Sequence, residues 1–233
     1  MEHKKPYIKI TKDGPYMVYG LDKIAEKVIL TDENGISVKY GDGETFKINV
    51  DPVAICRCGK SMNAPFCDGS HIEGGFDGTE TAPKTPILKN AEVFKGPDMN
   101  LADNEKYCAF ARFCDAGGRV WNLVMQGGAP ADKLAAKEAN LCPAGRLMMF
   151  TKSGEPMEDK YNPELNIIED GGLRISGPLW VKGGILVESE DGSVYEVRQK
   201  QTLCRCGASG NKPFCNGAHA SIRFHAHKST EDK

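Results

Sequence analysis

The strongest constraint on the fold is a pattern of three cysteines and one histidine that occurs twice at identical spacing. The first copy is CRCGKSMNAPFCDGSH, residues 56–71, and the second is CRCGASGNKPFCNGAH, residues 204–219. Chance does not repeat C-x-C-x8-C-x3-H within one chain, and matched spacing of this kind is typical of metal ligands. The candidate ligands are Cys56, Cys58, Cys67 and His71 in the first copy, and Cys204, Cys206, Cys215 and His219 in the second.

The spacing within each copy predicts two pairs of ligands. Residues two apart in an extended backbone point to the same side, so Cys56 and Cys58 can hold one metal. Cys67 and His71 are four apart, which is the same-face spacing of a helix. Disulfides would leave the histidines without a role, and C-x-C is a cramped loop for a bridge. Because Cys3His is also an accepted zinc set, the spacing leaves zinc and iron both open.

The repeat extends upstream of the cysteines, where strand-like segments precede each motif. The matching segments are Gly14–Gly20 with Gly177–Gly183, and Asp42–Gly59 with Asp191–Gly207. A phenylalanine follows each histidine by five residues, at Phe76 and Phe224. Only the first copy has residues 21–40, which predict a strand pair turned at Glu33-Asn34-Gly35. Asp-Gly turns are expected at Asp42 and Asp191.

Both motifs resemble the CDGSH iron–sulfur (NEET) family, whose pattern is C-x-C-x2-(S/T)-x3-P-x-C-D-G-(S/A/T)-H. The first copy matches at every position. The second departs once, with Asn216 where the family has Asp. The resemblance implies one [2Fe–2S] cluster per motif, with two cysteines on one iron and Cys plus His on the other. Residues expected around the clusters are Arg57, Ser61, Asp68, Ser70, Arg205, Ser209 and Asn216. The two arginines are expected either to donate to a cluster sulfur or to face solvent.

The resemblance also implies the architecture. We expect an α+β, β-rich fold in which two NEET-like cap and cluster-binding modules pack as a pseudo-two-fold intramolecular dimer, with interdigitated strands. The expected divisions are a first module at 1–80, a middle segment at 81–168 and a second module at 169–233. A monomer with this internal pseudo-dimer is the expected assembly.

Three further cysteines, Cys108, Cys114 and Cys142, lie between the motifs. Their C-x5-C and C-P-x-G patterns resemble a divergent single-cluster ferredoxin-like family, which implies a small α+β insert and a third cluster, [3Fe–4S] or [4Fe–4S]. A [4Fe–4S] cluster takes four cysteines, so Asp115 or an exogenous ligand would complete the set. The alternative is three buried thiols without a metal. One amphipathic helix is predicted in 131–145, with Asp132 as N-cap and Pro143 ending it.

Composition narrows the function. A net charge of −2 in 233 residues gives no basic surface for nucleic acid. The sequence has neither a signal-type start nor a run of about 20 apolar residues. A cytoplasmic protein without membrane contact is therefore expected. No catalytic triad or phosphate loop is evident. His3, His225 and His227 are expected to be solvated.

The chemistry is therefore expected to belong to the clusters rather than to an enzyme with its own substrate. Electron transfer or redox sensing with a redox partner is the first interpretation. Cluster storage or transfer to an apo iron–sulfur acceptor is the second, because a protonatable histidine ligand is labile in acid. A zinc-stabilised interaction module is the third.

Overall fold

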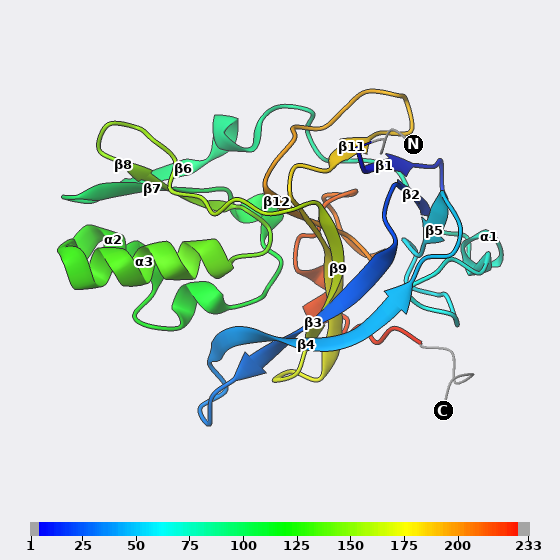
Figure 1. Ribbon diagram of the computed structural model, residues 1–233, viewed down its shortest axis with the longest axis horizontal. Coiled ribbons are helices and arrows are strands. Elements are labelled where there is room, and N and C mark those ends of the chain that lie inside the picture. Colours follow the sequence, from blue (N-terminus) through cyan, green and yellow to red (C-terminus); the bar gives the residue numbers. More distant parts are fainter. Residues whose placement is uncertain (1–4, 228–233) are drawn as a thin grey trace.

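The computed structural model describes residues 5–227, and it is built mainly from strands (Figure 1). The first copy supplies β1 (Tyr7–Ile10), β2 (Tyr16–Tyr19), β3 (Lys23–Thr31), β4 (Ser37–Lys47) and β5 (Val53–Ile55). The second supplies β9 (Glu164–Asp170), β10 (Ile175–Lys182), β11 (Leu186–Glu188) and β12 (Lys200–Leu203). Each motif then ends in a single helical turn, α1 (Ser70–Glu73) or α4 (Ala218–Ser221).

Strands of the two copies share their sheets. One sheet has the order β11-β1-β2-β5, and the other has the order β12-β10-β9-β3-β4. The joins between copies are parallel: β1 pairs with β11, and β3 pairs with β9. Figure 1 shows the long β3–β4 ribbon running beside β9. The copies therefore exchange strand edges, which leaves fewer unpaired backbone groups at the sheet margins.

The burial of these strands follows their sequence pattern. β1 alternates half-buried and buried positions, as expected for a strand with one face on the core. All eight residues of β10 are buried, because the strand lies between β12 and β9. The largest apolar cluster takes side chains from both copies, including Ile8, Tyr16, Ile24, Leu179, Leu203 and Phe214.

The predicted turns are confirmed in part. The strand pair of residues 21–40 exists as β3 and β4. Its turn is closed by two backbone hydrogen bonds: the Gly35 N–H donates to the Asp32 carbonyl, and the Asp32 N–H donates to the Ile36 carbonyl. Asp191-Gly192 also lies in a turn, where the Ser189 N–H donates to the Ser193 carbonyl. The turn predicted at Asp42-Gly43 is wrong, because both residues lie inside β4, where Asp42 pairs with Lys27 and Gly43 lies at a shift in the register.

The middle segment forms a separate α+β layer, at the left of Figure 1. An antiparallel sheet of order β6-β7-β8 is packed against two helices. Its elements are η1 (Ile87–Asn90), β6 (Glu92–Lys95), β7 (Met99–Asp103), η2 (Glu105–Tyr107), η3 (Phe113–Asp115), α2 (Val120–Gln126), α3 (Ala129–Leu141) and β8 (Leu147–Thr151).

The single-helix prediction for this segment is wrong in two respects. A second helix, α2, precedes α3, and α3 begins at Ala129 with Gly128 as its N-cap. Asp132 therefore lies inside the helix, where its backbone N–H donates to the Gly128 carbonyl. The sequence signal was ambiguous because Pro130, at the second helical position, is as good a start signal as Asp132. Within residues 5–227, every helix is too short or too polar to cross a bilayer.

Candidate metal centres

The paired cysteines of each copy have the separation expected for two ligands of one metal. Cys56 Sγ and Cys58 Sγ are 3.8 Å apart, and so are Cys204 Sγ and Cys206 Sγ. Two sulfurs bound at about 2.3 Å to a tetrahedral metal lie about 3.8 Å apart. A disulfide would need about 2.05 Å, so these pairs are thiols.

Each copy also places a cysteine beside its histidine. The separation of Cys67 Sγ and His71 Nδ1 is 3.4 Å, and that of Cys215 Sγ and His219 Nδ1 is 3.5 Å. Sulfur and imidazole nitrogen on one tetrahedral metal would be about 3.6 Å apart. The histidine lies in the one-turn helix, and the cysteine lies before that helix. The glycine between them, Gly69 or Gly217, has positive φ. That conformation suits glycine, which explains the C-x-G-x-H spacing.

The donors meet in pairs, without forming a set that surrounds one ion. Among residues 5–227, no three His, Cys, Asp or Glu side chains lie close enough to hold a single metal. A mononuclear zinc site needs four converging ligands. A [2Fe–2S] cluster instead takes two protein ligands on each of two irons. Both copies therefore present their donors as two separate pairs, one Cys–Cys and one Cys–His.

The loop between the pairs is held by equivalent hydrogen bonds in the two copies. The Cys56 N–H donates to the Pro65 carbonyl and the Cys67 N–H donates to the Ala54 carbonyl, at 2.8 and 2.9 Å. Cys204 and Cys215 make the same bonds to Pro213 and Thr202. The hydroxyls of Ser61 and Ser209 donate to the carbonyls of Phe66 and Phe214. Both serines therefore brace the ligand loop from within.

The pKa values of the first cysteines are lowered in both copies. Sharing a proton with the neighbouring cysteine, together with donation from backbone N–H groups, lowers the pKa of Cys56 and of Cys204 to about 6. The same sharing raises the pKa of Cys58 and of Cys206. Each pair thus gives up its first proton easily, and a metal must displace the second, since metals bind thiolates.

Arg57 and Arg205 are buried, which corrects the solvent-facing alternative. Arg57 is 1% exposed, donates to the carbonyls of Thr11 and Gly78, and lies 5.5 Å from the ring centroid of Phe76. Arg205 is 3% exposed, donates to the Gly177 carbonyl and lies 5.6 Å from the ring centroid of Phe224. Arg205 also donates to the Glu169 carboxylate at 2.6 Å. The arginines therefore tie the motif to the preceding strands and to the following phenylalanine.

The two motifs pack directly against each other at their Cys-Gly corners. A Cβ added to Gly59 would lie 2.7 Å from the Cys206 carbonyl oxygen, and one added to Gly207 would lie 2.5 Å from that of Cys58. Both glycines have positive φ. The reciprocal contact brings the two candidate sites to a common interface. Tyr16 adds to it, because its buried hydroxyl donates to the carbonyls of Cys204 and Pro213.

The sites differ in exposure. Cys67 and His71 are half-buried, whereas Cys215 and His219 are 3% and 4% exposed. Burial, with a smaller contribution from Arg205, lowers the pKa of His219 to about 4. The middle segment causes the difference, since a Cβ on Gly217 would lie 3.2 Å from the Cys108 carbonyl oxygen.

The position that distinguishes the motifs, Asp68 or Asn216, has a structural role in each. The Asp68 carboxylate accepts hydrogen bonds from Ser70 Oγ and from the backbone N–H groups of Met62 and Ser70. These bonds, led by the Ser70 hydroxyl, lower its pKa to about 2. Asn216 accepts one bond, from the Ala218 N–H. The first site therefore has a fixed negative charge that the second lacks.

The three middle cysteines are brought to one place. Cys108, Cys114 and Cys142 line a common enclosed cavity together with Arg146. Burial raises the pKa of Cys108, and burial with Asp115 raises that of Cys114 to about 12. Asp115 is not among the lining residues; its carboxylate faces outward and lies 3.6 Å from Arg119. Phe110, which also lines this cavity, is 43% exposed.

Sequence reasoning missed the residues that act between segments. In the sequence, Tyr16 is simply a tyrosine within a strand, and Gly59 and Gly207 are simply glycines after a cysteine. Neither pattern indicates which distant residue the side chain or backbone will contact. Buried Lys200, whose Nζ donates to the carbonyls of Ala139 and Asn140, likewise has no signal in the sequence. His225 and His227 lie at the end of the described chain, while His3 is outside the described residues.

The chain presents a Cys–Cys pair and a Cys–His pair of donors in each copy, on strands that the two copies share. This arrangement is typical of a metal-binding protein. The family model for the iron-binding zinc finger of CDGSH type matches residues 13–72 and 176–220. The family model thus finds this domain at two places in the chain, which is consistent with a tandem CDGSH protein. A search of curated proteins found no match, and neither did a search of solved structures.

Proposed function

We propose that this protein binds two [2Fe–2S] clusters and acts in electron transfer or redox sensing. The observation that carries the proposal is the pairing of donors, two sulfurs at 3.8 Å and a sulfur with an imidazole nitrogen at 3.4–3.5 Å, in both copies. A bound cluster would supply one-electron transfer. The chain supplies the ligands, the backbone N–H groups around the sulfurs and the buried arginines that hold the loops.

The strand exchange and the reciprocal Gly59–Gly207 contact support a pseudo-two-fold internal dimer. In this arrangement the two sites face each other across a single interface, so an electron that enters at one site has a short path to the other. The half-buried first site would receive or deliver the electron, because His71 is the more exposed imidazole.

The test is the amount of iron and acid-labile sulfide per chain in protein purified without oxygen. Two clusters correspond to about four of each. Zinc without sulfide would contradict the proposal. Replacing both His71 and His219 with cysteine should retain the clusters, slow their loss in acid and lower their potentials, since thiolate carries a negative charge that neutral imidazole lacks. An unchanged pH profile of cluster loss would show that the histidines are not the labile ligands.

Cluster transfer is the second candidate, and the exposure of Cys67 and His71 favours it. A half-buried ligand pair can be approached by the thiols of an acceptor protein, whereas the covered pair of the second site cannot. Transfer to an apo-ferredoxin at neutral pH would support this role. Rapid reversible reduction without loss of cluster would support electron transfer instead.

We also propose a third cluster at Cys108, Cys114 and Cys142. The support is the convergence of all three on one cavity, together with the packing of Cys114 and Cys142 in the apolar cluster that contains Cys215 of the second site. Iron at about seven or eight per chain is the expected result. A value of about four, unchanged when Cys114 is replaced by serine, would leave the middle cysteines as structural thiols.

A further inference from the structure

Each copy has an equivalent pair of aromatic rings beside its third cysteine. Phe46 and Phe66 meet edge to face with centroids 6.2 Å apart, and Tyr195 and Phe214 do so at 5.0 Å. Phe66 directly precedes Cys67, and Phe214 directly precedes Cys215. The surface next to each ring pair is thus the natural approach to a metal ligand.

In the second copy, the chain itself fills this place. The ring of Tyr107, from the middle segment, lies 5.2 Å from that of Phe214. The Arg198 guanidinium lies 5.2 Å from the Tyr107 centroid and 5.0 Å from the Phe214 centroid. The Ile87 N–H donates to the Glu196 carboxylate at 2.8 Å. Only about 10 Å³ of cavity remains among these groups.

In the first copy, the same place is an open groove of about 420 Å³. It is lined by residues 47–50 and 52–54, and by Phe66 and Cys67. Val50 lies six residues before Cys56, as Arg198 lies six before Cys204, but its side chain is 63% exposed. Within residues 5–227, Phe46 is the one ring that packs on Phe66, so nothing takes the part of Tyr107.

The groove has a lysine in its lining where the covered counterpart has a glutamate. Lys47 and Glu196 occupy equivalent positions in the two copies, because each lies five residues after the aspartate of its Asp-Gly pair, Asp42 or Asp191. Lys47 is directly opposite Lys23 in the β3–β4 register, and neither has an ion-pair partner within residues 5–227. Two like charges at facing positions repel each other, so an acidic partner is favoured there. The neighbouring Asp51 carboxylate accepts a hydrogen bond from the Gly20 N–H.

We propose that this groove docks an aromatic side chain flanked by acidic residues on a partner protein, and so brings that partner to Cys67 of the first site. The second copy shows the mode of binding, a tyrosine ring laid on the motif phenylalanine, and the lysines specify the flanking charge. The biological purpose of the docking rests on the proposed function, in which the partner accepts an electron or a cluster. The second site, already covered by Tyr107, makes no such contact.

The test uses the purified full chain and two labelled pentapeptides, one with a central tyrosine flanked by four acidic residues and one with alanine in its place. Fluorescence anisotropy should show saturable binding of the tyrosine peptide that weakens at high salt. Binding should weaken roughly tenfold or more in Lys23→Glu/Lys47→Glu, because like charges then face each other. Val50→Trp, at an exposed position, should block the groove without changing the fold.

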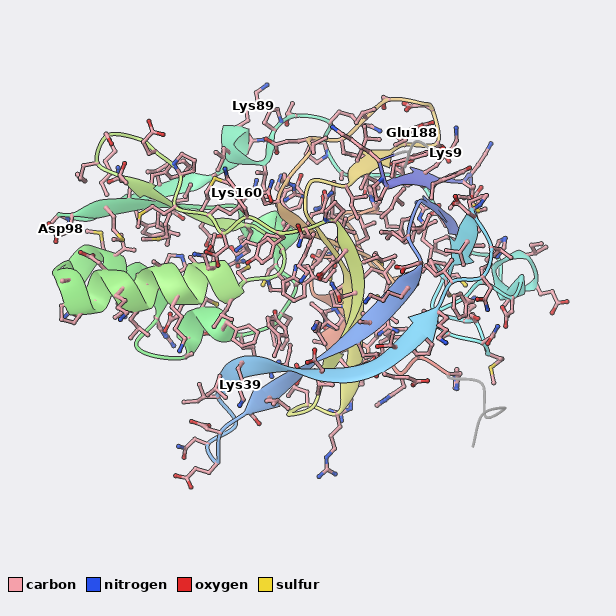
Figure 2. The ribbon with its side chains drawn as sticks, in the orientation of Figure 1. Lys9, Lys39, Lys89, Asp98, Lys160 and Glu188 are labelled. Carbon is pink, nitrogen blue, oxygen red and sulfur yellow. The ribbon has the colours of Figure 1, made fainter. Side chains whose placement is uncertain are left out.

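The matched control is Lys39→Glu/Lys89→Glu, which makes the same change in charge at two exposed lysines away from the groove (Figure 2). This variant should bind the tyrosine peptide as the unmodified chain does. Equal affinity for both peptides, equal weakening in the control, or no saturable binding would overturn the proposal. Iron and sulfide are measured on the same preparation. Iron-loaded protein that fails to bind the peptide overturns the docking proposal alone. Peptide binding by protein without iron contradicts only the proposed function.

Discussion

Arg205 illustrates how single residues hold the metal sites in place. Its guanidinium donates to the Glu169 carboxylate at 2.6 Å and to the Gly177 carbonyl at 3.0 Å, and it lies against Phe224. Arginine suits this position because its planar group can reach several acceptors while stacking on a ring. Arg57 plays the equivalent part in the first copy, where no carboxylate of residues 5–227 pairs with it. Both arginines support the ligand loops through the backbone.

Replacing Arg205 by lysine should therefore destabilise the fold. Lysine keeps the charge but cannot reach the carbonyl and the carboxylate together, which leaves buried acceptors unpaired, and the expected cost is about 2–3 kcal/mol. Denaturant unfolding of the metal-free protein measures it. Arg119→Lys, at a residue whose side chain is 71% exposed, is the matched control and should change stability by less than about 0.5 kcal/mol. Equal effects would show that the buried contacts contribute little.

The Asp68 carboxylate should set the difference in potential between the two proposed clusters. Its low pKa keeps it charged at neutral pH, and a nearby negative charge disfavours the addition of an electron. Asp68→Asn should raise the potential of the first cluster by tens of millivolts, since an exposed unit charge nearby contributes on the order of 1 kcal/mol. The second cluster should be unaffected. A redox titration followed by EPR resolves the two, and a single transition unchanged by the substitution would contradict the prediction.

At the scale of elements, the middle segment is an α+β layer that also covers the second site. Helix α3 carries Glu138, which is 1% exposed and accepts a hydrogen bond from the Gly117 N–H at 2.5 Å. This bond joins α3 to the loop that follows Cys114. The second carboxylate oxygen has no partner among the described residues. Burial raises the pKa of Glu138 to about 7.

The raised pKa makes stability depend on pH. Between about pH 4.5 and 7 the folded state holds a proton that the unfolded state has released, so the free energy of unfolding should fall as pH rises through this range. Glu138→Gln should remove this loss and gain about 1–3 kcal/mol over the unmodified protein at pH 8. Denaturant unfolding at pH 5 and pH 8 measures both. The exposed Glu155→Gln is the control; if it removes the same slope, Glu138 is not the source.

At the scale of the whole molecule, the exchange of strands and the packing of the two Cys-Gly corners unite distant parts of the chain. Gly59 contacts the backbone of Cys206, and Gly207 contacts that of Cys58. Neither glycine can take a side chain without moving the opposite metal site. The two sites should therefore be lost together when this contact is disturbed.

The comparison of Gly59→Ala with Gly35→Ala isolates this effect. Both glycines have φ near +75°, but a Cβ on Gly35 meets nothing within 4 Å, whereas one on Gly59 meets Cys206 at 2.7 Å. Gly35→Ala should cost about 1–2 kcal/mol from backbone strain alone. Gly59→Ala should cost more and lower the iron content of both sites. If it costs no more than Gly35→Ala and both sites keep their iron, the contact does not couple them.

Local patterns were sufficient to predict which cysteine and histidine side chains lie side by side within each motif, and many of the strands. C-x-C and C-x3-H bring their donors together through a few backbone angles, so the separations within Cys56–Cys58 and Cys67–His71 follow from spacing. The β3–β4 strand pair follows from alternation around a glycine turn for the same reason. The start of α3 was missed because Pro130 and Asp132 are competing local signals for one helix end.

Contacts between segments more than a hundred residues apart could not be predicted from these patterns. The Gly59–Cys206 contact and the cover that Tyr107 places over Phe214 both depend on which strands exchange edges and where the middle layer packs. Two nearly identical motifs thus acquire different surroundings, one open beside Cys67 and one closed over Cys215. Their chemistry is local and repeated, whereas their accessibility comes from packing, which no local pattern encodes.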